Sequence, residues 1–348
     1  MDLASILGTE FPLIQAPMAG VQDTALAIAV TEAGALGSLP AAVLAPAALR
    51  TELATLCRRS RRPFNVNFFC HSPPREDVQR QAQWHQLLAP YFAEFGLEPP
   101  QAAAAAARLP FDEATAEVLA EFTPAVVSFH FGLPSTALLQ RVRAWGARVL
   151  SSATTVEEAR WLEAQGVDAI IAQGSEAGGH RGMFLTDDLG SQLGTLELVP
   201  RICRAVRVPV IAAGGIADAA GVAAAMRLGA AGVQVGSAYL LCPEATTSAV
   251  HRRALSGEAG AATAVTNLFT GRPARGIVNR LMRELGPMNT AAPDFPLAAS
   301  ALAPLRAHLE SLGCGDFSPL WAGENTRTCR ERPAAEVTRE LLRAFADT

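Results

Sequence analysis

The sequence predicts an α/β protein, a (β/α)8 TIM barrel with an added helical region at its C-terminal end. Short apolar runs alternate with helical patterns along the chain, which is typical of parallel strands with helices outside them. Eight such runs occur, the number that closes a barrel. The length of 348 residues allows a barrel of about 250 residues and an addition. An open doubly wound sheet is the alternative, but no Gly-x-Gly-x-x-Gly follows the first run.

The expected strands follow one another in chain order with helix signals between them. They span residues 13–16, 36–39, 64–69, 125–131, 148–151, 169–173, 209–213 and 232–236. Thr155 and Glu158 have the spacing of a capping box before an apolar stretch. Asp218 is placed to begin another helix, which ends at Gly229.

Two regions depart from the regular repeat. Residues 79–121 are too long for one crossover helix and include the alanine run 102–107, so we expect an extra helical excursion there. Residues 244–348 follow the eighth strand and contain further helical patterns. We therefore expect a barrel over residues 1–243 and a helical extension over 244–348 that packs on it as a substrate-side cap.

Composition excludes several kinds of chemistry. All 29 basic residues other than histidine are arginines, so the chain contains no lysine. Schiff-base chemistry, a pyridoxal phosphate anchor and a Walker-type phosphate site each need that amine. The formal net charge is -4, and the arginines form no stripe, so we expect a small-molecule partner and no nucleic acid.

No feature of the sequence indicates a membrane, a disulfide framework or a metal. The chain starts without a positively charged leader and has no apolar run of about 18 residues, so we expect a cytoplasmic protein. The six cysteines form no Cys-x-x-Cys pair, and we expect reduced thiols. The histidines are dispersed, with no ligand spacing.

Polar residues gather where the expected strands end. Alternation along a strand directs Asn65 and Asn67 into the barrel, and it does the same for Ser128 and His130 on the next strand. Unpaired buried polar groups cost about 1 to 3 kcal/mol each. We therefore expect a planar, heteroatom-rich cofactor, although a network of side chains and water is an alternative. Two further amides at strand ends belong to Gln173 and Gln234.

Glycine-rich loops follow the sixth, seventh and eighth expected strands. Residues 173–182 contain three glycines near His180, which suits a close backbone approach to a ligand and a base. A surface loop with a solvated histidine is the alternative. Gly214 and Gly215 precede one helix signal, and Gly236 precedes another. Backbone N–H groups there can bind a phosphate without lysine, at the usual phosphate site of such barrels.

With these blocks in this order, the chain resembles the nitronate monooxygenase family, formerly called 2-nitropropane dioxygenases. The resemblance runs nearly from end to end and implies an FMN-dependent oxidoreductase. The segments that resemble the family are residues 15–20, 63–67, 127–132, 173–182, 213–216, 234–237 and 269–276.

The resemblance also implies roles for individual residues. His180 matches the catalytic base, and His130 and Phe295 would lie at the substrate. In the implied reaction an alkyl nitronate gives one electron to the flavin, and O2 then leads to a carbonyl compound and nitrite. His180 would deprotonate a neutral nitroalkane first. The implied FMN-binding residues are Ala16, Pro17, Met18, Ala19, Asn67, Gln173, Gly178, Gly179, Gly214, Gly215, Gln234, Val235, Gly236 and Ser237.

One stretch departs from the family. Well-studied members carry tyrosines and a lysine where this chain has Phe295, Ala299 and Ala303. Three arginines could compensate if the substrate is anionic: Arg181, Arg272 and Arg275. The substitution also keeps an FMN-dependent NAD(P)H reductase open as an alternative, and a noncatalytic ligand-binding protein is a third hypothesis. The sequence leaves a homodimer open.

Overall fold

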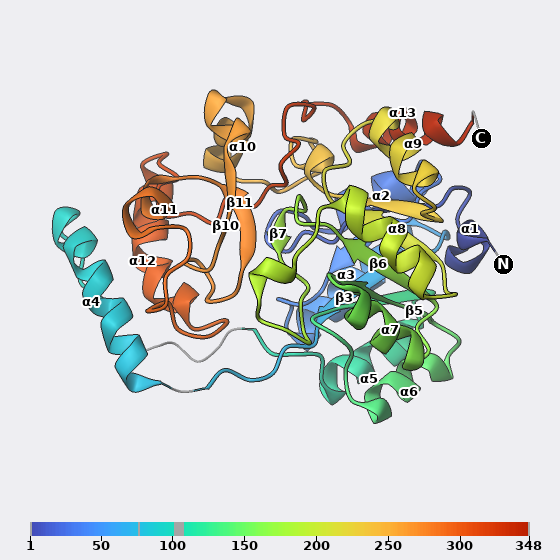
Figure 1. The fold of residues 1–348 in the computed structure, drawn as a ribbon, viewed down its shortest axis with the longest axis horizontal. Helices are drawn as coiled ribbons and strands as arrows, with labels where there is room; N and C mark the ends of the chain where they lie inside the picture. Colours follow the sequence, from blue (N-terminus) through green and yellow to red (C-terminus); the bar gives the residue numbers. More distant parts are fainter. Residues whose placement is uncertain (1, 76, 101–107, 347–348) are drawn as a thin grey trace.

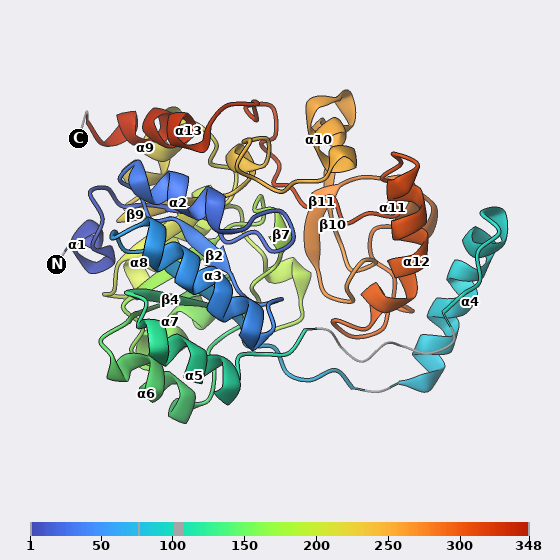
Figure 2. The ribbon, with the colours of Figure 1, turned by 180° about the vertical axis from the view of Figure 1, so that it is seen from behind.

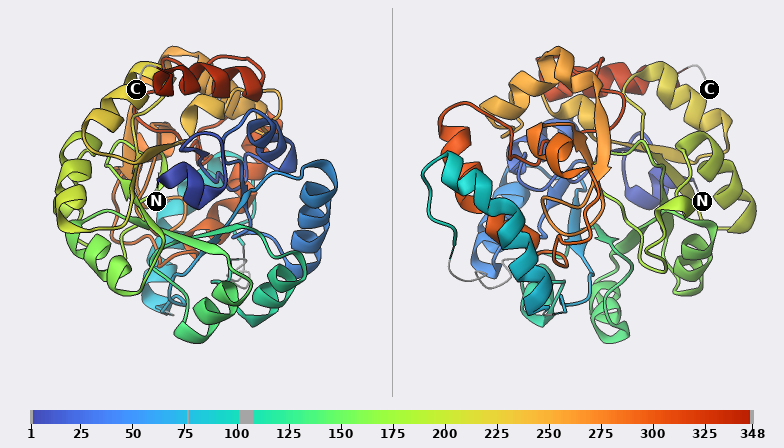
Figure 3. Two further views of the ribbon diagram at one scale, coloured as in Figure 1. Left: turned by 90° about the vertical axis from the view of Figure 1, so that its right-hand side faces the viewer. Right: turned by 60° about the vertical axis from the view of Figure 1, so that its left-hand side comes forward.

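Eight parallel strands form a nearly closed barrel in the computed structural model, which describes residues 2–75, 77–100 and 108–346. The strands follow the order β1-β9-β8-β6-β5-β4-β3-β2. A parallel bridge between Ile14 and Leu36 brings the two edges together, and Figure 3 shows the ring of helices around the barrel. The predicted fold is confirmed. The barrel strands are β1 (Leu13–Gln15), β2 (Ser38–Pro40), β3 (Asn65–Phe69), β4 (Val126–His130), β5 (Arg148–Ala153), β6 (Ala169–Gln173), β8 (Val210–Ala213) and β9 (Gly232–Val235).

Helices cover the outside of the barrel, and most of them begin at a capping side chain. Thr155 accepts a hydrogen bond from the backbone of Glu158 at 3.2 Å, and Asp218 accepts one from Gly221 at 2.8 Å, as the sequence predicts. The return bond of the predicted capping box differs, because the Glu158 carboxylate accepts from the backbone of Thr154 at 2.7 Å. The helix after Asp218 has its last helical residue at Arg227, two before Gly229. The ring contains α2 (Thr24–Glu32), α3 (Pro46–Arg59), α5 (Glu113–Phe122), α6 (Thr136–Ala144), α7 (Val156–Ala164), α8 (Thr195–Ala205) and α9 (Ala219–Arg227), with the short helix η1 (Leu189–Ser191) before α8.

The C-terminal helix completes this ring. Helix α13 (Ala334–Leu342), followed by η4 (Arg343–Phe345), packs against α2 and α9, and Figure 2 shows it along the side of the barrel. It buries Val337 and Leu341 in the apolar layer between strands and helices. Residues 244–348 therefore divide between the ring and a separate layer at one end of the barrel.

That separate layer joins two parts of the chain that lie far apart in sequence. Helix α4 (Val78–Glu94) packs on α12 (Ala298–Ser311), away from the barrel. Their apolar faces share a cluster that includes Trp84, Leu88 and Leu305. The predicted excursion over 79–121 thus contains one cap helix, α4, and one ring helix, α5. The alanine run 102–107 lies outside the described residues. The rest of this layer includes α10 (Ala249–Ser256), η3 (Glu258–Ala261) and α11 (Arg280–Leu285).

A second, three-stranded sheet was not predicted. It pairs β10 (Thr263–Thr266) with β11 (Ala274–Ile277), and β11 with the short strand β7 (Gly179–His180). His180 therefore lies on a paired strand. The flexible-loop alternative for this segment is wrong.

The barrel interior is apolar at one end and polar at the other. Ile14, Ile171 and Ile211 fill it near the strand beginnings, where α1 (Leu3–Leu7) closes the end with Leu3 and Leu7. Asn65 and Asn67 are buried while Val66 and Phe68 pack toward the helices, as the alternation predicts. The same alternation would turn Phe131 toward the helices, but Phe131 instead joins Phe69 and Phe295, because its positive φ of 70° redirects the chain after β4. No helix within the described residues has the length and apolar character needed to span a membrane.

Candidate active site

A large cavity opens at the carboxyl ends of the barrel strands. Its empty space, including the part open to solvent, is about 1370 Å³. Of the fourteen residues predicted for cofactor binding, all but Val235 line it. The side chain of Val235 packs in the layer between strands and helices.

The turn that contains Ala16 through Ala19 forms one wall and is fixed from beneath. Gln22 accepts a hydrogen bond from the backbone of Met18 at 2.9 Å and one from the Gln15 amide at 2.8 Å. Its own amide donates to the carbonyl of Ser38 at 2.6 Å. Because Gln15 and Gln22 are both buried, the turn is held rigidly against the cavity.

The side-chain amides around the cavity divide into bonded and unpaired groups. Gln173 donates to the carbonyl of His180 at 2.9 Å and accepts from the backbone of Gly182 at 2.7 Å, so it holds the histidine segment. Asn67 donates to Ser128 Oγ at 2.9 Å. Gln234 has a buried Oε1 that receives no hydrogen bond from the described residues. This oxygen is free to accept a hydrogen bond from a ligand.

The main chain of His180 is fixed from three sides. Strand pairing places it opposite Ala274 of β11. Its carbonyl accepts from Gln173 and also from His130 Nε2, at 3.1 Å. Since a carbonyl cannot donate, Nε2 of His130 carries the proton, and Nδ1 of His130 accepts from Ser152 Oγ at 2.6 Å. Burial lowers the pKa of His130 to about 3, so this ring stays neutral and positions His180.

The imidazole of His180 forms part of the cavity wall, and its hydrogen bond decides which nitrogen is basic. Nε2 lies 2.9 Å from Thr270 Oγ1. The Thr270 hydroxyl can donate to the carbonyl of Arg272 at 3.4 Å, which leaves its oxygen to accept from Nε2–H in the tautomer that we assign. Nδ1 makes no hydrogen bond within the described part of the chain. The lone pair of Nδ1 is therefore available to a substrate.

Burial and nearby positive charge keep His180 neutral. Burial lowers its pKa well below the ordinary value, and the charge of Arg108 lowers it further. Aromatic rings pack around the imidazole: the centroids of Phe295 and Trp321 lie 5.3 and 5.6 Å from it, and that of Phe69 lies 6.0 Å away. A neutral imidazole in apolar surroundings can accept a proton from carbon.

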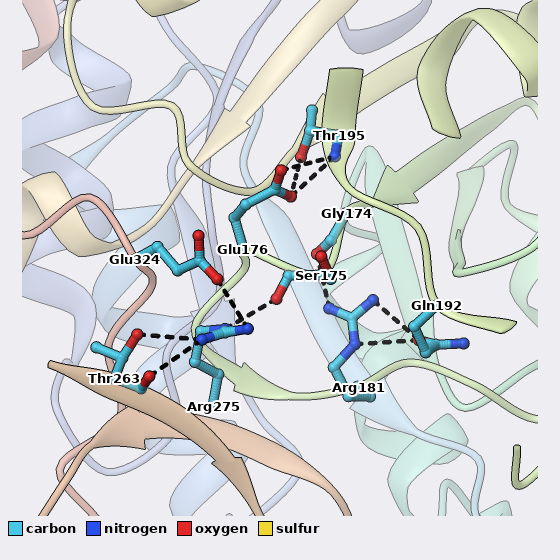
Figure 4. Close-up of polar contacts among 9 residues, drawn as sticks. All are labelled: Gly174, Ser175, Glu176, Arg181, Gln192, Thr195, Thr263, Arg275 and Glu324. Atoms are coloured by element: carbon cyan, nitrogen blue, oxygen red, sulfur yellow. Dashed lines mark hydrogen bonds and ion pairs between the residues drawn. The ribbon is translucent and has the colours of Figure 1, made fainter. Parts of the chain in front are cut away.

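Two buried arginines clamp the segment that leads from β6 to His180 (Figure 4). Arg181 donates to the carbonyls of Gly174 and Gln173 at 2.7 and 2.8 Å and to Gln192. Arg275 donates to the carbonyl of Ser175 at 2.8 Å and forms an ion pair with Glu324 at 2.9 Å. Both guanidinium groups are therefore bonded to the protein.

Close backbone packing shapes the opposite end of the cavity. Gly214 has φ of 120°, a conformation that favours glycine, and a Cβ there would lie 2.7 Å from Thr195 Oγ1. Glu176 accepts from the backbone and the hydroxyl of Thr195 at 2.8 and 2.9 Å, which fixes the loop. The N–H groups of Gly215 and Ser237 donate to no other described residue. They are free to bind an anion such as phosphate.

Comparison with known proteins gives this site a family. A sequence model described as nitronate monooxygenase matches residues 2–344. The chain belongs to the nitronate monooxygenase family. It is 44% identical over 340 residues to a nitronate monooxygenase of Pseudomonas aeruginosa, covering 97% of both proteins.

Solved structures agree with this assignment. The chain is similar to nitroalkane oxidase from Streptomyces ansochromogenes, with a TM-score of 0.88, 38% identity and coverage of 99% of this chain and 98% of the other. It is also similar to FabK from Thermotoga maritima, with a TM-score of 0.74, 27% identity and coverage of 99% and 96%. This protein is therefore an oxidoreductase of the nitronate monooxygenase family.

Within this family member, sequence reasoning missed part of the cavity wall. The lining residues that were not predicted include Arg108, Trp321, Ala322, Gly323 and Asn325. The backbone of Gly276 bridges to Trp321, and Gly323 donates to Ser237 Oγ at 2.9 Å, so the segment that begins at Trp321 continues the second sheet into the site. The sequence signal available for this wall was an aromatic residue followed by small residues, Trp321-Ala322-Gly323. Phe295, predicted to contact substrate, packs beside His180 behind the lining residues.

Proposed function

We propose that this protein uses FMN and O2 to oxidise alkyl nitronates to a carbonyl compound and nitrite, and that it accepts nitroalkanes after deprotonating them. The observation that carries the proposal is the neutral imidazole of His180, which lines the cavity with Nδ1 unpaired. The family is generally flavin-dependent, and the relatives named for nitronate and nitroalkane oxidation match nearly the whole chain.

The cavity fits FMN in three respects. Gln234 Oε1 lacks a donor, which an N–H group of the flavin ring would supply. Gly178 lets two segments of the cavity wall pack together and set its shape, since a Cβ there would lie 2.5 Å from the backbone nitrogen of Gly323. The free N–H groups of Gly215 and Ser237 would hold the phosphate of FMN without lysine. FMN, when bound, would supply the acceptor for electrons leaving the substrate.

The residues of the chain would bind the substrate and move its proton. His180 would take a proton from the α-carbon of a nitroalkane at Nδ1, while Thr270 holds Nε2–H. General-base help of this kind is worth about 10²- to 10⁴-fold in rate. A nitronate has already lost that proton and would need only binding. The rings of Phe69 and Trp321 would exclude water from the reacting carbon.

A second candidate function is an FMN-dependent NAD(P)H reductase on the same barrel. The similarity to FabK and the apolar residues Phe295, Ala299 and Ala303 support it. Both functions would use the same flavin site, so the electron donor distinguishes them.

The first test follows the visible flavin spectrum of the purified protein. We expect a rapid spectral change on anaerobic mixing with ethyl nitronate and little response to NADH or NADPH. With air admitted, O2 uptake and nitrite release should follow. Complete bleaching by NADH or NADPH, with no response to nitronate, would replace the first function by the second. Colourless protein that takes up no added FMN would refute both.

A further inference from the structure

Arg108 brings a positive charge to the wall of the cavity. It lines the cavity, yet its guanidinium makes no hydrogen bond or ion pair with any residue that the structure describes. Burial lowers the pKa of Arg108, and the positive charge of Arg306 lowers it further. An arginine still keeps its proton at neutral pH, so the charge is present, and the described residue nearest to it in a stacked contact is Phe295, whose ring centroid lies 5.8 Å from the Cζ.

The other arginines near the site are committed to the protein. Arg181 and Arg275 hold the histidine segment (Figure 4). Arg272 donates to the carbonyl of Met183, and its Cζ lies 4.0 Å from the centroid of the Phe131 ring. The three arginines expected to compensate for the missing lysine therefore have structural partners. Arg108, which sequence reasoning did not consider, differs from these three because its guanidinium makes no hydrogen bond to a described residue.

The backbone around Arg108 is anchored beside the histidine. His71 Nε2 donates to the carbonyl of Arg108 at 3.2 Å, and Phe111 donates to the carbonyl of Phe69 at 2.8 Å. The Arg108 Cζ lies 5.8 Å from the centroid of the Phe295 ring, whose centroid is 5.3 Å from that of His180. Arg108 and His180 thus lie around the same aromatic ring and line the same cavity.

We propose that Arg108 binds the anionic group of the substrate and sets the specificity of this enzyme for substrates with a planar, two-oxygen anion. This inference rests on the proposed nitronate oxidation. Guanidinium groups match such anions with two parallel N–H···O bonds. A nitronate has this shape, and so does a carboxylate at the far end of a nitronate substrate. Either group would fill the role that the unpaired guanidinium leaves open.

Two nitronates that differ at one end separate the two sources. Propyl-1-nitronate carries a terminal methyl group where propionate 3-nitronate carries a carboxylate. We expect Arg108→Gln to raise KM for propionate 3-nitronate by about ten- to a hundredfold, the effect of losing a charged hydrogen bond. An equal rise for propyl-1-nitronate assigns Arg108 to the nitronate group. A rise confined to propionate 3-nitronate assigns it to the carboxylate. Unchanged KM for both overturns the proposal.

Two variants and one binding measurement complete the test. Arg108→Lys keeps the charge and should recover part of the affinity. Arg306→Gln is the matched control, because Arg306 is an exposed neighbouring cation already bonded to Glu310 at 2.8 Å, and it should leave KM unchanged. Equal KM rises in Arg306→Gln and Arg108→Gln would overturn a specific role.

Calorimetric titration of the FMN-loaded proteins with propionate 3-nitronate and propyl-1-nitronate without O2 separates binding from turnover. Arg108→Gln should weaken binding by the same factor as KM, and equal affinity in wild type and variant would overturn the inference. If the wild type binds these anions through Arg108 but releases no nitrite on aeration, the proposed function fails while the inference stands.

Discussion

Replacing Thr270 with valine tests whether its hydroxyl selects the basic nitrogen of His180. Valine keeps the shape of this buried side chain and removes the oxygen that lies 2.9 Å from Nε2. A neutral hydrogen bond contributes about 0.5 to 1.5 kcal/mol, which corresponds to a change of about two- to tenfold in the population of the tautomer with Nδ1 unprotonated. We therefore expect kcat/KM for nitroethane to fall about two- to tenfold in Thr270→Val.

The assay compares two substrates, because only one of them needs the base. Nitrite release from nitroethane and from ethyl nitronate would be measured in the wild type, Thr270→Val and Thr270→Ser. Ethyl nitronate should react at a nearly unchanged rate, and Thr270→Ser, which keeps the hydroxyl, should restore most of the nitroethane rate. His180→Ala gives the upper limit of about 10²- to 10⁴-fold. Equal losses on both substrates, or no loss on nitroethane, would refute the tautomer argument.

Three further predictions concern the cofactor, the histidine segment and pH. Gly178→Ala should reduce the FMN content of folded protein, because the new Cβ would lie 2.5 and 2.6 Å from backbone atoms of Gly323 and Ala322; absorbance at full cofactor content would contradict this. Arg181→Met removes the hydrogen bonds that the carbonyls of Gln173 and Gly174 accept from the guanidinium, although Gly174 still accepts from the backbone of Ala177. It should lower the free energy of unfolding by about 1.5 to 3 kcal/mol, the contribution of a hydrogen bond to a charged group, measured by urea denaturation; a loss under about 1 kcal/mol would show that these contacts are not needed for stability. The pKa of His130 falls to about 3 in the folded state from an ordinary 6.5, so the unfolded chain binds more protons below pH 6.5 and stability should decrease as pH falls from 6.5 toward 3. Unfolding between pH 7 and 5 tests this, with His130→Gln expected to flatten the slope.

Local patterns were sufficient to predict the barrel but not the second sheet. Each barrel strand is a short apolar run with its own signal, as at 169–173, where the observed strand has the same bounds. The second sheet joins Gly179–His180 to Ala274–Ile277 and Thr263–Thr266, and such distant pairing leaves no periodic trace. The position of α13 in the ring was not predicted either, because its contacts with α2 and α9 join parts of the chain that lie far apart in sequence.

Site residues were predicted where the residue type itself indicates its chemistry. They were missed where only tertiary contacts bring a residue to the site. His180 and the glycines at 214 and 215 were found because a base and phosphate loops have recognisable composition. Arg108 was missed because one arginine among 29 has no local mark. The hydrogen bonds of Arg181, Arg272 and Arg275 to the protein are visible only in the folded structure. Comparison with them shows that the guanidinium of Arg108 makes no such bond to a described residue.

The positive charge near His180 acts differently on the two substrate forms. After burial, Arg108 is the strongest influence that lowers the pKa of His180, and Arg272 adds to it. Deprotonating a nitroalkane would create two charged groups. The positive charge of Arg108 would destabilise the imidazolium of His180 and stabilise the nitronate, so the two effects largely offset each other. A nitronate formed beforehand receives only the favourable part. In the proposed reaction, the electrostatics of the site would therefore favour nitronates over neutral nitroalkanes, even with a well-placed base.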